Sequence, residues 1–349
     1  MSSQRDFHDI DERKKLILRA VTDEYISTAE PVGSRSIARR YNLGISPATI
    51  RNEMADLEEA GYLEQPHTSS GRIPSDKGYR FYVDVMLEPK EPSRSLKQRI
   101  LREFIQRQGE IEALIQHTAK ILATLTNQAA LVISPSFQES TIQHIRLLPL
   151  DEMRLLVVLV TDPGFVNTRI VELSRGISGG DIERISGYLN GRLKGLTIRD
   201  LRATLVNEIQ SELSRYRSLA EEATSLLVQA LDDTGPERIY REGTVNMLGQ
   251  PEFQDVKKVK GLLEVLEEDG LMFEALSGTP PGRGTEVVIG HENRHAGLYP
   301  CSIVSASYEI KGRVSGAIGI IGPTRMDYSR IVALVKYVSE CLSEFLSEA

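Results

Sequence analysis

Residues 34–62 read SRSIARRYNLGISPATIRNEMADLEEAGY, and this stretch decides the fold of the N-terminal part of the chain. Ser46 is a favoured N-cap residue, and Pro47 suits the first helical position because its missing N–H is not needed there. The pattern predicts a helix that ends at Gly61. Its buried face is expected to be formed by Ile50, Met54 and Leu57. The residues before it predict a shorter helix over 34–41, followed by a turn rich in Asn and Gly.

The flanking segments extend this pair of helices into a larger motif. Apolar spacing predicts another helix over 13–27. After the second helix of the pair, two short strands are expected at 62–64 and around Ile73, joined by the polar loop 65–72. An amphipathic helix is expected over 75–87. The order helix, helix, turn, helix, hairpin is typical of a winged helix-turn-helix.

In such a motif the second helix of the pair enters the major groove, with its N-terminal residues at the base edges. The residues at that end are Ser46, Pro47, Ala48, Thr49, Arg51 and Asn52. Arg can bind guanine through two hydrogen bonds and Asn can do the same with adenine, while Ala or the Thr methyl can contact a thymine methyl. Contacts to the phosphate backbone are expected from Ser34, Arg35, Arg39 and Arg40, and from His67, Thr68, Ser69 and Arg72 in the hairpin loop. We therefore expect a DNA-binding domain.

The charge of the chain limits how it can bind DNA. The formal net charge is −7, and residues 1–90 carry 13 Lys and Arg against 15 Asp and Glu. Binding that ignores sequence depends on neutralising many phosphates, so this balance argues against a protein that coats nucleic acid. A DNA-binding domain with this composition requires its positive charges to be concentrated on one face.

Composition also excludes several other classes of protein. The two cysteines, Cys301 and Cys341, are too few for a disulfide framework or a cysteine-based zinc site, and they fit a reducing cytosol. No apolar run approaches the length of a membrane span, and the N-terminal residues lack the apolar core of a signal peptide. We expect a cytoplasmic protein without membrane attachment, cofactor or metal.

The remainder of the chain predicts an α+β architecture. After a Pro-containing linker at 88–93, one long helix is expected over 96–127. Strands are expected at 129–134, 143–149, 153–161 and 165–173, and again at 286–290, 301–310 and 314–321. Helices are expected at 180–194, 199–231 and 252–268, and from Asp327 to the end. This order favours a sheet domain interrupted by a helical insertion over one α+β domain with long helices.

A seam of apolar residues at 209–227 is typical of a packing face between helices. Spacing alone favours packing within the chain. A winged helix has a small base-reading surface, however, and specific repressors usually double it across a two-fold axis, which favours an interface between subunits.

Two other motifs are better explained by structure than by chemistry. His291-Glu292-Asn293-Arg294-His295 matches the H-E-x-x-H pattern of zinc peptidases, which requires a helix. It follows a strand-like segment and precedes Gly297 and Pro300, so a polar loop is expected, with a metallopeptidase as the alternative. Gly316, Gly319 and Gly322 lie within a strand pattern and indicate close backbone packing rather than a nucleotide-binding loop.

Several segments resemble the family of the heat-inducible transcription repressor HrcA. They are Pro31–Ser34, Ser46–Met54, Leu57–Leu63, His67–Ser75, Gly78–Arg80, the Ile289–Asn293 segment and Gly319–Tyr328. The resemblance covers essentially the whole chain. It is specific because the long N-terminal signature and the Gly-Pro-Thr-Arg-Met-Asp-Tyr segment both occur.

The resemblance implies a dimeric repressor of chaperone operons that binds the inverted repeat CIRCE and that the chaperonin GroEL keeps active. It implies a winged-helix domain at 1–90, a GAF-like domain at 91–194 and 276–349, and a mostly helical dimerisation domain inserted at 195–275. No catalysis and no ligand for the GAF-like domain are implied. The alternative is a ligand-gated winged-helix regulator that holds a small effector in the GAF-like domain.

Overall fold

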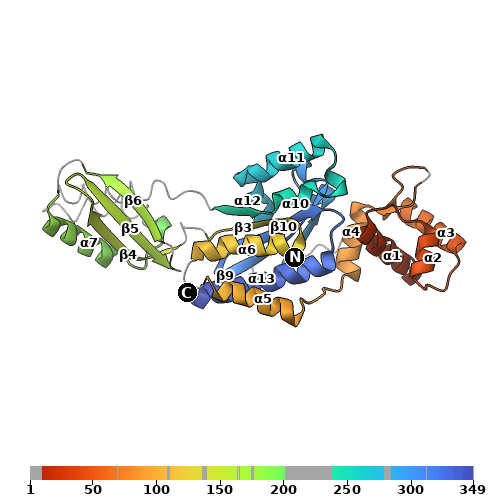
Figure 1. Ribbon diagram of the computed structural model, residues 1–349, viewed down its shortest axis with the longest axis horizontal. Helices are drawn as coiled ribbons and strands as arrows, with labels where there is room; N and C mark the ends of the chain where they lie inside the picture. The colour runs from red at the N-terminus through yellow and green to blue at the C-terminus, as the bar shows by residue number, and fades with distance from the viewer. Residues whose placement is uncertain are drawn as a thin grey trace.

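The computed structural model describes residues 10–348, apart from positions 69, 108–110, 136–139, 163, 165, 174–176, 201–237, 279–283 and 312. The described residues form a mixed α+β protein with three groups of elements in a row (Figure 1). A helical N-terminal domain lies at one end, a five-stranded sheet with helices lies in the centre, and a three-stranded sheet with one helix lies at the other end. Among the described helices, none combines the length and apolar character that a membrane span requires.

The N-terminal domain contains the predicted pair of helices. Its elements are α1 (Glu12–Thr28), α2 (Ser34–Arg40), α3 (Pro47–Glu59), β1 (Leu63–Glu64) and β2 (Ile73–Pro74). The Ser46 hydroxyl accepts a hydrogen bond from the Thr49 N–H at 3.1 Å, so the predicted cap is confirmed. The predicted buried face of α3 is confirmed as well, because at most 1% of the surface of Ile50, Met54 or Leu57 is exposed.

The helical segment predicted over 75–87 is present, but its second half is π-helical rather than α-helical. It forms α4 (Asp76–Phe81), and the chain then continues as one π-helical turn, η1 (Tyr82–Met86). Ser75 caps α4 by accepting the Gly78 N–H and donates its own hydroxyl to the Gly61 carbonyl at 2.6 Å. A Cβ atom on Gly78 would lie 2.1 Å from the Tyr62 carbonyl oxygen, so this contact requires glycine.

The single helix predicted over 96–127 is wrong, because the chain forms α5 (Arg94–Ile105) and α6 (Ile111–Thr126) instead. The two helices bury their apolar residues against different partners. Phe104 of α5 packs against Phe345 of α13 (Tyr328–Glu348), with ring centroids 5.5 Å apart, whereas α6 also covers the sheet. One straight helix could not meet both surfaces.

The central sheet is antiparallel throughout, with the strand order β7-β3-β10-β9-β8. Its strands are β3 (Ala129–Ile133), β7 (Ile239–Glu242), β8 (Thr285–Ile289), β9 (Cys301–Ile310) and β10 (Arg313–Pro323). One face packs on α6 and α13, with α5 packed against α13, and this apolar cluster continues without a break into the core of the N-terminal domain. The opposite face packs on α10 (Thr244–Leu248), η3 (Pro251–Phe253), α11 (Val256–Glu267) and α12 (Asp269–Ser277).

The glycines of β10 serve the close packing that the sequence predicts. A Cβ atom on Gly316 would lie 2.4 Å from both the Ile133 carbonyl oxygen and the Tyr308 hydroxyl. At Gly319 it would meet the Leu276 side chain at 2.5 Å. The side chains beside this strand therefore occupy the space that a larger residue would need.

The second sheet is formed by β4 (Thr141–Pro149), β5 (Arg154–Asp162) and β6 (Val166–Glu172), in that order. With α7 (Gly179–Leu193) it builds an apolar core of its own. This unit interrupts the large sheet between β3 and β7.

The insertion begins and ends at different residues from those predicted, as the pairing of the strands shows. Residues 141–193 were assigned to the large sheet domain, but they pair and pack among themselves. Strand β7 was assigned to the insertion 195–275, but it pairs with β3. The described part of the interrupting unit contains a sheet and is not mostly helical. The apolar seam at 209–227 lies outside the described residues.

Candidate nucleic-acid interface

The N-terminal end of α3 presents short polar and cationic side chains to solvent. Ser46, Pro47, Ala48, Arg51 and Asn52 are exposed, and Thr49 is half-buried. The hydroxyls of Ser46 and Thr49 lie 2.9 Å apart, so they hydrogen-bond to each other. The predicted base-reading residues thus lie together on one accessible end of a helix whose opposite face is buried.

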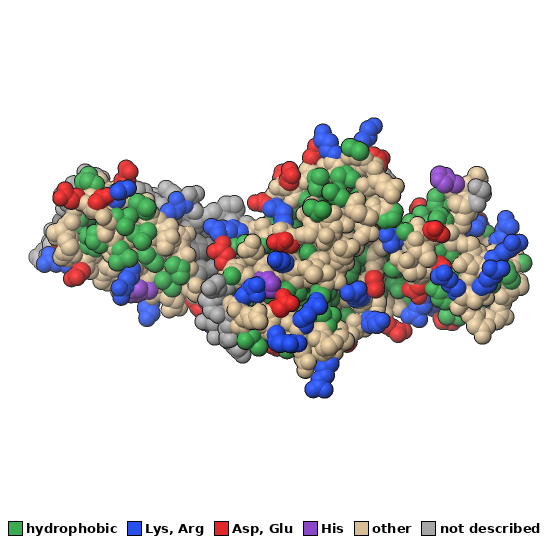
Figure 2. All heavy atoms as spheres, in the orientation of Figure 1, with side chains coloured by type: hydrophobic (Ala, Val, Ile, Leu, Met, Phe, Trp, Pro, Cys, Tyr) green, Lys and Arg blue, Asp and Glu red, His purple; other side chains and the backbone are tan. Residues whose placement is uncertain are grey.

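Three arginines of the neighbouring helices α2 and α3 are not neutralised by a described carboxylate. Arg35, Arg39 and Arg51 are exposed, and none of them forms an ion pair with another described residue. Figure 2 shows Lys and Arg side chains gathered on the outer side of the N-terminal domain, where α2 and α3 lie. Unpaired guanidinium groups are the donors that phosphates and base edges require.

The acidic residues of α3 are neutralised from α1. Glu53 lies 3.5 Å from both Arg13 and Lys14, and Asp56 lies 3.0 Å from Lys14. The hydrogen bond with Asp56 is the largest of the effects that raise the pKa of Lys14. Two carboxylates of α3 are thus neutralised locally, while Arg35, Arg39 and Arg51 form no ion pair with another described residue.

The hairpin loop is ordered by two side chains that the sequence analysis did not single out. The Gln65 side-chain amide donates to the carbonyls of Thr68 and Ser70 at 3.1 and 3.0 Å. The Ser70 hydroxyl donates to the His67 carbonyl and accepts the His67 N–H. His67 and Thr68 are left exposed at the tip, whereas Ser69 lies outside the described residues.

Arg72 occupies a different place from the phosphate-contacting position expected for it. Its guanidinium lies 2.8 Å from Glu58 of α3, and only 16% of its side chain is exposed. Its backbone forms a β-bridge with Val32, and a Cβ atom on the neighbouring Gly71 would lie 2.5 Å from the Val32 carbonyl. Arg72 therefore holds the base of the hairpin to α3. A charged group this far out of water requires a partner, which Glu58 supplies.

Two further predicted backbone contacts lie on α2. Ser34 is half-buried at the first position of the helix, next to the exposed Arg35. Arg40 pairs with Glu24 at 2.8 Å, although 59% of its side chain remains exposed. Of the predicted α2 cations, Arg35 and Arg39 are the two whose charge is not already balanced.

The H-E-x-x-H segment forms the polar loop that the sequence predicts. It follows β8 and makes the 3-10 turn η4 (Gly290–Glu292) rather than an α-helix. The His291 ring lies 2.7 Å from Asp76, and Glu292 accepts a hydrogen bond from Arg80 at 2.9 Å. Both partners belong to α4, so this loop contacts the N-terminal domain. Among the described residues, no three potential ligands gather as a metal site would require.

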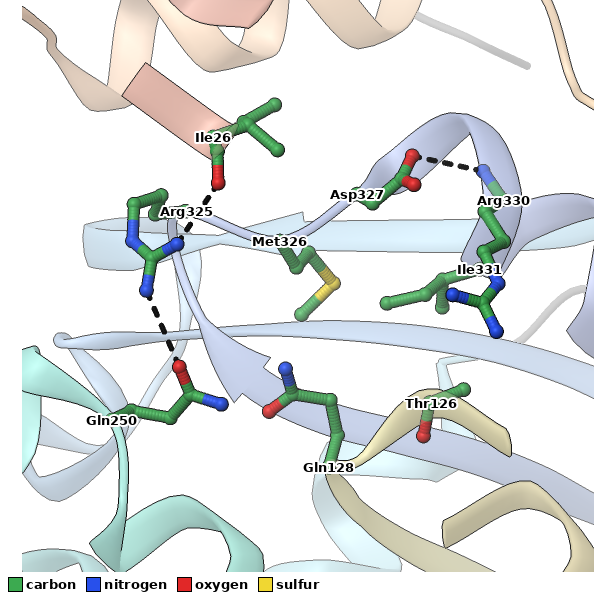
Figure 3. Close-up of a pocket in the computed structure, with 9 residues that line it drawn as sticks. All are labelled: Ile26, Thr126, Gln128, Gln250, Arg325, Met326, Asp327, Arg330 and Ile331. Atoms are coloured by element: carbon green, nitrogen blue, oxygen red, sulfur yellow. Dashed lines mark hydrogen bonds between the residues drawn. The ribbon is translucent and has the colours of Figure 1, made fainter. Parts of the chain in front are cut away.

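A small cavity of about 190 Å³ lies where α1 meets the central domain. Its lining includes Ile26, Gln128, Gln250, Arg325 and Arg330 (Figure 3). Arg325 donates to the Ile26 carbonyl at 2.9 Å and to Gln250 at 3.2 Å. The side-chain oxygen of Gln128 is buried there without a hydrogen-bond partner. The cavity is thus part of the contact between domains and lies apart from the free arginines.

Comparison with known proteins identifies the family. The family model described as the HrcA protein C terminal domain matches residues 112–332. A protein from Pelotomaculum thermopropionicum, named heat-inducible transcription repressor HrcA, is 44% identical over 337 residues, which cover 97% of each chain. A protein of the same name from Moorella thermoacetica is 43% identical over 340 residues, which cover 97% of this chain and 98% of the relative. The chain belongs to the HrcA family.

A solved structure supports the fold of this HrcA family member. The crystal structure of a protein described as hypothetical covers 97% of this chain and 99% of its own, with a TM-score of 0.64 and 24% identity. At that level of identity the likeness concerns the fold alone. The order of helices and sheets described above is therefore one that a folded natural protein adopts.

Proposed function

We propose that this protein represses chaperone operons by occupying an inverted-repeat operator, CIRCE, as a homodimer. As a member of the HrcA family it is a heat-inducible transcription repressor. The N-terminal domain acts as a winged helix-turn-helix, with α2 and α3 as the helix pair and the hairpin β1–β2 as the wing. The protein acts in the cytoplasm, without catalysis and without a cofactor. The relatives' names do not favour the alternative of a ligand-gated regulator.

The observation that carries this proposal is that three arginines of α2 and α3, namely Arg35, Arg39 and Arg51, are exposed and form no ion pair with another described residue. Arg51 and Asn52 read bases through paired hydrogen bonds, while Ala48 and the Thr49 methyl contact apolar base edges. Arg35 and Arg39 contact phosphates, together with the hydroxyls of Ser34 and Ser46. The wing residues His67, Thr68 and Ser69 contact the backbone that flanks the groove.

The proposed homodimer is supported by an apolar face of the three-stranded sheet that no other described element covers. Leu155, Val157 and Leu159 of β5 are buried against α7. The strand register gives the opposite face a set of apolar side chains, with Arg146 and Thr168 on either side of Val158. The apolar residues are Leu148, Leu156, Val158, Val160, Val166 and Ile170. Val166 and Ile170 are 61% and 59% exposed, and Figure 2 shows hydrophobic side chains gathered over this sheet. An apolar face of this kind marks an interaction surface.

In this proposal the five-stranded sheet is the GAF-like domain, interrupted by the dimerising unit that contains β4, β5 and β6. The partner that regulates the repressor is the chaperonin GroEL, as the resemblance to the family implies. GroEL keeps the repressor active until heat-damaged proteins occupy the chaperonin, and repression then falls.

Quantitative gel shift tests the proposal. The full-length protein is titrated onto a duplex that carries an inverted repeat from a chaperone promoter and onto a scrambled duplex of equal length and composition. At a fixed salt concentration we expect the repeat to bind at least about a thousandfold more tightly. Adding GroEL is expected to increase the active fraction of repressor. Equal affinity for the two duplexes, with GroEL present and the protein folded, would refute the function.

A further inference from the structure

Helix α4 is shared between the N-terminal domain and the central domain (Figure 1). On one side, its cap residue Ser75 hydrogen-bonds to Gly61, and Gly78 packs against the Tyr62 carbonyl. On its other side, α4 contacts strand β8 and the loop that follows it. Because the helix belongs to both packing units, its orientation couples one to the other.

The contacts between α4 and that loop are charged and specific. Asp76 accepts hydrogen bonds from the His291 N–H at 2.8 Å and from the His291 ring at 2.7 Å. Arg80 donates to the Glu292 carboxylate and to the Val287 carbonyl. Gly290 has a φ of +52°, and a Cβ atom there would lie 2.2 Å from the Asp76 carboxylate. The loop backbone therefore approaches α4 as closely as glycine permits.

A second set of contacts attaches α1 and the linker. Arg325 donates to the Ile26 carbonyl near the end of α1 and is held by Glu252 at 2.6 Å. The Tyr79 and Tyr328 rings lie 5.9 Å apart. In the linker, the Lys90 N–H donates to the Ser329 carbonyl at 2.9 Å.

The ion pairs of Arg80 and Arg325 are largely shielded from solvent, whereas the His291 side chain that meets Asp76 is exposed. The side chains of Arg80 and Arg325 are 11% and 12% exposed, and Glu252 is 19% exposed. Exposed ion pairs contribute little to binding between surfaces, whereas losing one partner of a shielded pair is costly. Without Glu292, the only described ion pair that Arg80 would keep is the one with Asp84, at 3.0 Å, within the N-terminal part of the chain. Arg325 lines the cavity and connects the Ile26 carbonyl with Glu252. These contacts stabilise the orientation of the N-terminal domain that the structure shows.

We propose that Arg80 and Asp76, together with their partners Glu292 and His291, form an interdomain latch that positions α3 for operator binding. This inference rests on the proposed binding of an inverted repeat by a dimer. Two half-sites lie at a fixed spacing and angle, so both recognition helices must reach their grooves at once. A latch that holds each helix in place avoids the entropic cost of ordering two mobile domains on binding. Glu292 and His291 are positioning residues, because they lie away from the free arginines.

The test compares two substitutions of the same kind. Glu292→Gln removes the charge that faces Arg80 across the latch. Glu274→Gln is the matched control, because Glu274 also faces an arginine, Arg294 at 2.6 Å, but within the central domain. Both full-length variants are titrated onto the inverted repeat and onto a duplex with one half-site. We expect Glu292→Gln to lose about tenfold in affinity for the inverted repeat and less than about twofold for the half-site. The control is expected to match the wild type on both.

A second readout needs no DNA. Lys90 is exposed, but its backbone N–H is hydrogen-bonded to Ser329, so release of the latch should free the linker backbone to enter the active site of trypsin. We expect cleavage after Lys90 to be about threefold faster in Glu292→Gln than in the wild type or the control. If Glu292→Gln does not fold, His291→Ala replaces it, since 76% of the His291 side chain is exposed.

The outcomes separate this inference from the proposed function. If the wild type does not prefer the inverted repeat to the half-site, the proposed dimeric function fails, and the trypsin comparison alone decides whether the latch exists. If the wild type shows the preference but Glu292→Gln keeps it, or binds the repeat more tightly, the positioning role is refuted. Unchanged cleavage after Lys90 in both latch variants would refute the latch itself.

Discussion

Arg51 and Arg72 are both arginines of the N-terminal domain, but their surroundings give them different roles. Arg51 is exposed and has no ion pair among the described residues. Arg72 is mostly buried and is paired with Glu58. Sequence reasoning assigned both to the DNA interface, because residue type and position in the motif are the same whether or not a carboxylate lies nearby. Pairing depends on which helix packs beside the hairpin.

Replacing Arg51 with Ala should reduce the difference between the protein's affinity for operator DNA and its affinity for random DNA. Loss of a paired hydrogen bond to a base costs about 1–3 kcal/mol and affects the cognate sequence most. Dissociation constants of wild type and variant on the inverted repeat and on scrambled DNA measure this. Equal weakening on both duplexes would show that Arg51 contacts phosphate instead.

Salt dependence should distinguish Arg35 from Arg72. Arg35→Ala removes an unpaired cation, so the slope of log affinity against log salt is expected to fall by about 1. Arg72→Ala removes an internal ion pair and should lower the thermal unfolding midpoint while leaving that slope unchanged. A reduced slope for Arg72→Ala would show that Arg72 contacts a phosphate after all.

The two cysteine thiols should be unreactive in the folded protein. Burial raises the pKa of the Cys301 thiol to about 12 and also raises the pKa of Cys341. At pH 8 both are therefore almost entirely protonated, and the thiol is a far weaker nucleophile than the thiolate. Alkylation with iodoacetamide, followed by mass spectrometry, should modify neither cysteine until denaturant is added. Rapid labelling of Cys301 without denaturant would contradict this burial.

At the scale of elements, two helical glycines should respond oppositely to the same change. Gly78→Ala places a methyl group against the Tyr62 carbonyl and should lower the free energy of unfolding by about 1–3 kcal/mol. Gly191 of α7 has open space around it, so Gly191→Ala should raise that free energy by about 0.5–1 kcal/mol. Denaturant unfolding of both variants measures the difference. Equal effects would show that α4 does not pack on Tyr62.

Helix starts were predictable because their chemistry is local. The helix start at Ser46 depends only on residues within one turn of Ser46, and the helix end at Gly61 depends only on residues within one turn of Gly61. The division of 96–127 into α5 and α6 was not predictable, because Phe104 and the residues of α6 pack on surfaces formed by α13 and the sheet. The pairing of β7 with β3 was missed for the same reason: about a hundred residues separate the two strands.

For the whole molecule, the apolar face of the three-stranded sheet that carries Ile170 should control self-association. Ile170→Asp places a charge in that face and should shift the protein from dimer to monomer at micromolar concentration, because an unpaired charge in an apolar interface is costly. Val245→Asp is the control, since Val245 is 77% exposed on α10 in the central domain. Sedimentation equilibrium measures both variants. A dimeric Ile170→Asp protein would place the subunit interface elsewhere.

The amino-acid sequence alone determined the order of the N-terminal helices and hairpin, the α+β class and the residues at the N-terminal end of α3. These depend on periodicity, capping and turn chemistry, which act over a few residues. Only the tertiary structure decided which arginines remain unpaired, which strands share a sheet and how α4 joins two domains. Those outcomes depend on contacts between residues far apart in the chain, such as Arg80 with Glu292, and no local pattern encodes which distant carboxylate will reach a given cation.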